Sequence, residues 1–205
     1  MIPASEALQR LREGNHRFVT EATSRHSFEL AEAQEPFAIV LGCADSRVPA
    51  EIVFDQGLGD LFVIRVAGNI VAPSQIGSVE FAAERYHTRL VVVLGHSRCG
   101  AVLATLEEMQ RPSDRQSRNL RSIVDRVRPS VEPLLAGPHS DDPDALVEQA
   151  VRANVRVSVR QLRHGSDVLE QLIQEQGLAV VGAEYSLETG VVDFFDEQTV
   201  SQKQS

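Results

Sequence analysis

Three short apolar runs constrain the fold of this chain more than any other feature. They cover residues 37–42 (FAIVLG), 61–66 (LFVIRV) and 90–95 (LVVVLG). The runs are almost continuously apolar rather than alternating, and helical patterns separate them, which is typical of parallel strands buried on both faces of a sheet. A fourth strand is expected at 178–182, and 185–195 reads as an antiparallel edge hairpin. We therefore expect an α/β fold with a central, mostly parallel β-sheet of about four parallel strands plus an antiparallel edge strand, flanked by helices.

The spacing of apolar residues elsewhere predicts helices. An N-terminal amphipathic helix is expected over Ser5–Thr20, with Ser5 as its cap, because Leu8, Leu11 and Phe18 fall near helical spacing. Further helices are expected over Ser74–Tyr86, from about Arg98 to Met109, and over Ser166–Glu175 with Gly177 as its C-cap. Most of 114–164 is also expected to be helical, with breaks at Pro129, Pro133, Gly137 and Pro143. A short helical turn is expected at Pro49–Phe54.

Length and composition favour one soluble domain spanning residues 1–205. The net charge of −9, without a basic stripe, disfavours a nucleic-acid partner. The longest apolar runs fall far short of the ~20 residues that span a bilayer, and the first twelve residues lack the apolar region of a signal peptide. We therefore expect no membrane partner and a cytoplasmic location, where cysteines are more often free, metal-bound or catalytic than disulfide-bonded.

The only two cysteines each follow one of the apolar runs. Cys43 begins the motif C-A-D-S-R, and Cys99 ends the motif G-H-S-R-C after the run at 90–95. Ligands bind parallel sheets at the carboxyl ends of the strands, so these motifs are expected at the same edge. Cys99 is also expected near a helix N-terminus, where the partial positive charge favours a thiolate. The expected result is a cluster of Cys43, His96 and Cys99.

Two thiolates and an imidazole suit Zn²⁺, and three protein ligands leave a fourth position open, as in catalytic zinc sites. Zinc lowers the pKa of a bound water to roughly 7, which makes hydroxide available near neutrality. If the segment after Cys43 is extended, alternation places Asp45 and Arg47 on its side of the chain. Asp45 then either accepts a hydrogen bond from the hydroxide or becomes the fourth ligand in a closed state, and Arg47 decides between the two by holding the carboxylate.

Other interpretations of the two cysteines are buried small hydrophobes, a disulfide or unrelated thiols. A phosphatase loop is excluded, because it needs five residues between Cys and Arg and here there are three. The joint presence of the two motifs after two apolar runs favours the metal site over these alternatives.

At these residues the chain resembles the β-class carbonic anhydrases, zinc enzymes that interconvert carbon dioxide and bicarbonate. The resemblance implies one Zn²⁺ per subunit on Cys43, His96 and Cys99, with Asp45 and Arg47 as the catalytic pair. It also implies substrate contacts from Gln34, which matches the substrate-orienting glutamine of the family, and from Phe81 and Gly100. Phe62 matches an apolar pocket residue that is usually contributed across the dimer interface. An obligate homodimer, or a dimer of dimers, is implied as well, with the N-terminal helix wrapped around the partner.

Two departures from the family pattern bear on substrate and regulation. Phe81 stands where plant-type members have tyrosine, and Val40 stands where allosteric members have tryptophan in an inhibitory bicarbonate pocket. Arg65 and Tyr185 match two other residues of that pocket, so the pocket is incomplete rather than absent. Because the tryptophan is missing, we expect an open, plant-like site without strong bicarbonate cooperativity. Alternative functions are hydrolysis of carbonyl sulfide or carbon disulfide on the same scaffold, and a non-catalytic role with structural zinc.

Overall fold

The computed structural model describes residues 2, 4–21, 34–111, 117–137 and 142–195 of the 205 in the chain. The chain divides into two compact units, Met1–Gln34 and Glu35–Ser205. Within the first unit, the helix α1 covers Ala4–Glu21. It therefore begins before Ser5, and Ser5 is not its cap as the sequence predicted. The assignment of 1–205 to a single domain stays a prediction.

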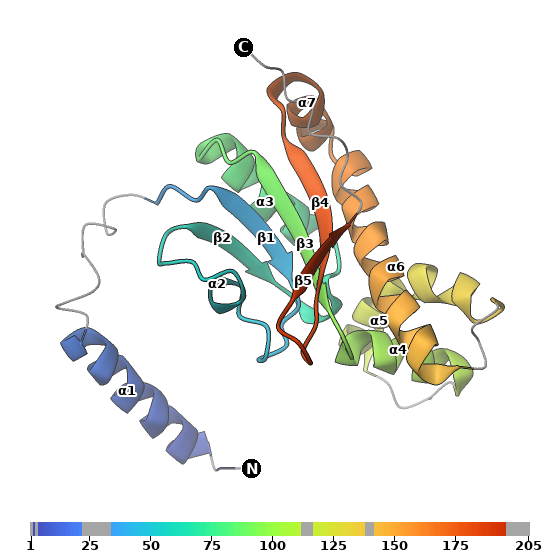
Figure 1. The fold of residues 1–205 in the computed structure, drawn as a ribbon, viewed down its shortest axis with the longest axis horizontal. Helices are drawn as coiled ribbons and strands as arrows, with labels where there is room; N and C mark the ends of the chain where they lie inside the picture. The colour runs from blue at the N-terminus through green and yellow to red at the C-terminus, as the bar shows by residue number, and fades with distance from the viewer. Residues whose placement is uncertain (1, 3, 22–33, 112–116, 138–141, 196–205) are drawn as a thin grey trace. The chain divides into compact units, whose positions relative to one another are not determined.

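The second unit is built on one sheet of five strands in the order β2-β1-β3-β4-β5 (Figure 1). The strands cover Ala38–Gly42 (β1), Leu61–Arg65 (β2), Leu90–His96 (β3), Ala179–Tyr185 (β4) and Val192–Phe195 (β5). The first four run parallel, and β5 pairs antiparallel with β4. The predicted α/β fold with an antiparallel edge strand is confirmed.

Helices connect the four parallel strands. They are α2 (Ala50–Val53), α3 (Pro73–Arg85), α4 (Gly100–Gln110), α5 (Arg118–Val131), α6 (Pro143–His164) and α7 (Asp167–Gln176), with 3₁₀ turns η3 (Ala67–Asn69) and η4 (Glu132–Leu134). The helices α4 to α7 all lie between β3 and β4 along the chain. Gly177 ends α7 in the left-handed conformation, at φ 73°, as its predicted C-cap role requires. Pro129 does not break the helix as predicted: it lies inside α5 and removes one N–H donor, and the helix ends two residues later, at Val131.

The two faces of the sheet bury different side chains. Ile39 and Leu41 of β1 face a core that also contains side chains of α3, α6 and α7. Val40, between them, faces a second core with Ala50 of α2. This alternation is why α3 and α2 lie on opposite sides of the sheet (Figure 1). Among the described residues, no helix combines the length and apolarity needed to cross a membrane.

A topological switch point lies between β1 and β3. The chain leaves β1 for β2 on one side and returns to β3 on the other. Crevices at the carboxyl ends of such strands are where open α/β sheets bind their ligands. Cys43 directly follows β1, and His96 is the last residue of β3, so the two predicted motifs meet at this edge.

Candidate metal centre

Cys43, His96 and Cys99 form a compact buried cluster at the switch point. Their ligand atoms lie within 4.8 Å of one another, and the two Sγ atoms are 3.9 Å apart. Two sulfurs bound to one tetrahedral zinc, each at about 2.3 Å, would lie about 3.8 Å apart. Only 5% of Cys43, 1% of Cys99 and none of His96 is exposed. The donor set and its spacing therefore fit zinc.

The imidazole of His96 is held in the tautomer that a metal requires. Its Nδ1 lies 2.9 Å from the carbonyl oxygen of Ser97, which can only accept, so Nδ1 carries the proton. In the neutral ring Nε2 then carries the lone pair, and this buried atom has no hydrogen-bond partner among the described residues. A buried nitrogen without a partner is costly unless it binds a ligand such as a metal ion.

The two cysteines share hydrogen-bonding interactions that favour thiolate at Cys43. The hydrogen bond with Cys99 is the main cause that lowers the pKa of Cys43 well below its usual range; burial opposes this, and contacts with His96 and the Gly68 N–H assist it. The same hydrogen bond and burial raise the pKa of Cys99. Without metal, one proton is thus retained between the sulfurs, and metal binding would release it.

Asp45 lies beside this cluster and is fixed by Arg47. Arg47 donates from Nε to Oδ1 at 2.9 Å, from Nη2 to Oδ2 at 2.7 Å, and from its backbone N–H to Oδ1 at 3.0 Å. Oδ2 of Asp45 is also 3.8 Å from Nε2 of His96. The Arg47 hydrogen bonds keep the pKa of the Asp45 carboxyl far below its usual range, so it is ionised. Ser46 and Arg47 form a turn rather than the extended segment that we expected.

Arg65, at the end of β2, holds the segment that carries Cys43 and Asp45. Its guanidinium donates from Nε to the carbonyl oxygen of Cys43 at 3.0 Å and from Nη2 to the carbonyl oxygen of Asp45. The sequence suggested a different role for Arg65, in a bicarbonate pocket with Val40 and Tyr185. Of the other two residues of that pocket, Val40 is buried in the sheet. Tyr185 accepts through its backbone carbonyl oxygen from the backbone N–H of Ser97.

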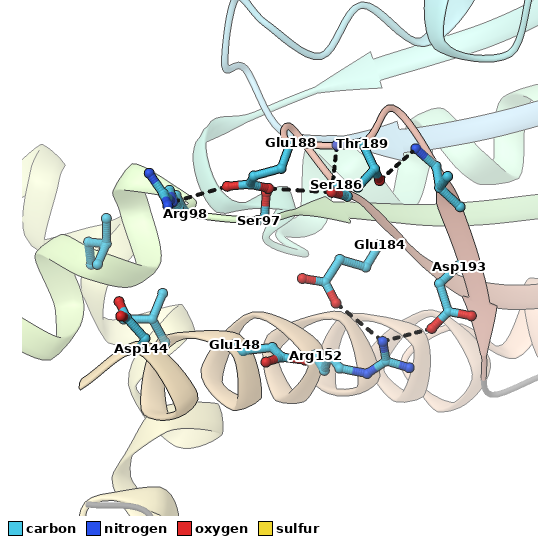
Figure 2. A pocket seen from close by; sticks show the side chains of 13 residues that line it. Ser97, Arg98, Asp144, Glu148, Arg152, Glu184, Ser186, Glu188, Thr189 and Asp193 are labelled. Atoms are coloured by element: carbon cyan, nitrogen blue, oxygen red, sulfur yellow. Dashed lines mark hydrogen bonds and ion pairs between the residues drawn. The ribbon is translucent and has the colours of Figure 1, made fainter. Parts of the chain in front are cut away.

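Glu188, in the β4–β5 hairpin, holds the loop between His96 and Cys99 from the outside (Figure 2). It accepts from Ser97 Oγ at 2.7 Å and pairs with Nε of Arg98 at 3.0 Å. The backbone N–H of Leu187 donates to Ser97 Oγ at 3.0 Å. The sequence places Glu188 only within the edge hairpin expected at 185–195, because nothing in the local pattern indicates a partner 91 residues away.

The residues predicted to contact substrate lie in three places. Phe62 and Phe81 pack together with ring centroids 6.3 Å apart, and Phe81 also packs edge-on against Tyr86 at 5.7 Å. Gly100 is the first residue of α4, directly after Cys99. Gln34 is exposed and is the last residue of the first unit.

Comparison with known proteins gives a consistent result. A family described as carbonic anhydrase matches residues 38–192. Carbonic anhydrase 2 of Mycobacterium tuberculosis is 40% identical over 90% of this chain and 89% of its own length. The crystal structure of the β-carbonic anhydrase CafA of Aspergillus fumigatus has a TM-score of 0.78 at 28% identity, covering 94% of this chain and 90% of that one. Tetrameric β-carbonic anhydrases of Sordaria macrospora include a structure with TM-score 0.78 at 25% identity, over 94% of this chain and 98% of that one.

Proposed function

The chain belongs to the β-class carbonic anhydrase family, and from that premise we propose that it hydrates carbon dioxide reversibly. Zinc would be held by Cys43, His96 and Cys99. Asp45 and Arg47 would be the catalytic pair. The carrying observation is the buried Nε2 of His96, which has no hydrogen-bond partner among the described residues and lies between two cysteines and a carboxylate. When bound, zinc supplies a Lewis acid that lowers the pKa of water to roughly 7.

Asp45 would orient the attacking water. As an ionised carboxylate it can only accept hydrogen bonds, so a water beside it must turn a proton toward Asp45 and a lone pair elsewhere. Arg47 engages both carboxylate oxygens and so opposes their movement into a fourth ligand position. A closed state with Asp45 as a ligand would require that this pair breaks.

The substrate would lie against an apolar surface, because carbon dioxide carries no net charge and no hydrogen to donate. The aromatic group of Phe62, Phe81 and Tyr86 offers such a surface. Phe62 is level with Ile39, at the other end of β1 from Cys43, so this surface would serve the site of a second subunit across the dimer interface. Gln34 would donate a hydrogen bond to a substrate oxygen. Gly100, at the start of α4, would also contact the substrate. These assignments follow the family motif.

The active form would be a homodimer or a dimer of dimers located in the cytoplasm. Phe81 is 52% exposed and Phe37 is 58% exposed in the single chain. Exposed aromatic side chains of this kind are typical of surfaces that a partner covers. Light scattering that showed a stable, fully active monomer would contradict this assembly.

Stopped-flow carbon dioxide hydration with parallel metal analysis tests the proposal. The wild-type protein should contain one zinc per chain and hydrate carbon dioxide, and Cys43→Ser should lose both the zinc and the activity. Carbonyl sulfide serves as the competing substrate in the same assay. Hydrolysis of carbonyl sulfide without carbon dioxide hydration, or retained zinc without either reaction, would overturn the proposal.

A further inference from the structure

Two buried polar side chains on α6 point at the 3₁₀ turn η3 rather than at water. Asn154 and Ser158 are each 2% exposed and lie four residues apart, on the same face of the helix. Asn154 donates from Nδ2 to the carbonyl oxygen of Gly68 at 2.8 Å. Ser158 donates from Oγ to the carbonyl oxygen of Asn69 at 3.0 Å. Each bond satisfies a buried carbonyl group of η3.

The turn η3 has an unusual backbone that depends on such support. Gly68 and Asn69 both have positive φ, at 69° and 44°. A Cβ at Gly68 would lie 2.9 Å from Cβ of Ala101 in α4, so only glycine fits there. Asn69 in the left-handed region costs conformational free energy, which the surrounding contacts must offset.

The same turn contacts the cluster of cysteines and histidine. The backbone N–H of Gly68 lies 3.4 Å from Sγ of Cys43 and donates to it. An N–H group aimed at a thiolate stabilises its negative charge, so the sulfur stays deprotonated and available to a metal. The carbonyl oxygen of Gly68 therefore accepts a hydrogen bond from Asn154 of α6, and its backbone N–H donates one to Sγ of Cys43.

We propose that Asn154 and Ser158 are positioning residues of the metal centre, which fix η3 so that the Gly68 N–H stays directed at Sγ of Cys43. The inference rests on the proposed function, in which Cys43 binds zinc. Without either side chain, a buried carbonyl group of η3 loses its partner and the turn relaxes toward another conformation. The N–H···S bond is then weakened, and the metal is held less tightly.

The test compares Asn154→Ala and Ser158→Ala with wild type and with Val159→Ala. Val159 is a matched control, because it lies on the same helix, is fully buried and belongs to the core against the sheet. Zinc affinity is measured by competition with a chromophoric chelator, urea unfolding gives the stability of each variant, and the cobalt-substituted proteins give the sulfur-to-metal charge-transfer band.

We expect Asn154→Ala and Ser158→Ala to weaken zinc binding about 10-fold to 100-fold and to shift the charge-transfer band to lower energy. Val159→Ala should leave both unchanged, even where it destabilises the fold as much or more. The proposal is overturned if the two variants bind zinc within twofold of wild type, or if Val159→Ala weakens binding equally. A wild-type protein that binds neither zinc nor cobalt would instead reject the proposed function.

Discussion

Arg47 engages both carboxylate oxygens of Asp45, at 2.9 and 2.7 Å, while Oδ2 of the same carboxylate lies 3.8 Å from Nε2 of His96. Asp45 is therefore placed between a fixed cation and the atom that faces the metal position. Because Arg47 binds the carboxylate from one side, the other side of the carboxylate can accept a hydrogen bond from a water.

Asp45→Asn should separate metal binding from turnover. The amide has the same shape but no charge, so it cannot form the ion pair with Arg47 or accept as strongly from water. We expect zinc content to stay near one per chain and the carbon dioxide hydration rate to fall at least about 100-fold, the lower range for loss of a proton-accepting group. Asp125→Asn, on the exposed face of α5, is the control. A hydration rate near that of wild type would contradict the role of Asp45.

Glu188→Ala should loosen the loop between two metal ligands. The substitution removes the acceptor of Ser97 Oγ and the partner of Arg98. We expect zinc to dissociate severalfold faster, with most of the fold unchanged. The difference from wild type should shrink at about 1 M salt, where the Debye length is about 3 Å and exposed pairs such as Arg98–Glu188 are screened.

Glu148→Ala is the matched control for this variant. Glu148 of α6 lines the same pocket as Ser97, Arg98 and Glu188, and Figure 2 draws no bond from it to the loop. Zinc release is followed by transfer to excess chelator. If Glu148→Ala and Glu188→Ala release zinc equally fast, the contact of Glu188 with Ser97 and Arg98 is not what retains the metal.

Glu184→Gln should change how stability depends on pH. Burial raises the pKa of Glu184, and the attraction of Arg152 only partly opposes it. The folded state therefore holds the proton more tightly than the unfolded state, and stability is lost as pH rises from the ordinary glutamate pKa of about 4.3 through the raised folded value. Glutamine has no charge to bury, so the variant escapes this loss.

The measurement is urea unfolding of both proteins at about pH 4 and about pH 8, bracketing the titration that starts near 4.3. The variant should gain stability relative to wild type as pH rises. A relative stability that falls with pH would show that the ion pair with Arg152, at 3.3 Å, outweighs the cost of burial.

The sequence could predict the cluster of Cys43, His96 and Cys99 because the positions of these residues follow from local rules. The ends of parallel strands meet at one edge of the sheet, which brings Cys43 to His96, and a helix start directly after Cys99 keeps that thiol beside them. The supporting residues follow no such rule. Asn154 lies 86 residues from Gly68, and a polar residue within a helical pattern reads as solvated unless its partner is known.

The Asp45–Arg47 pair was predicted for a reason that the structure corrects. Alternation along an extended segment would place the two side chains together, but Ser46 and Arg47 form a turn. The backbone N–H of Arg47 donates to Oδ1 of Asp45, as aspartate often accepts in turns. The pair is thus formed by turn chemistry, in which the side chain of Asp45 fixes the backbone that presents Arg47.

Gly95→Ala should disturb the metal centre through packing alone. Gly95 precedes His96 at the end of β3, and a Cβ there would lie 2.6 Å from Cγ2 of Val155 in α6. Valine cannot move its methyl group without leaving its preferred rotamer, so strand and helix must separate. We expect a loss of about 1 to 3 kcal/mol in unfolding free energy, typical of an overpacked core, together with weaker zinc binding.

The double variant Gly95→Ala/Val155→Ala provides the decisive comparison. Val155→Ala alone should destabilise the fold by leaving a cavity, whereas in the double variant the new methyl group occupies part of the space that valine leaves. The two effects should therefore be less than additive in urea unfolding, and zinc affinity should return toward the wild-type value. Strictly additive losses would mean that the close approach of Gly95 to Val155 does not set the position of His96.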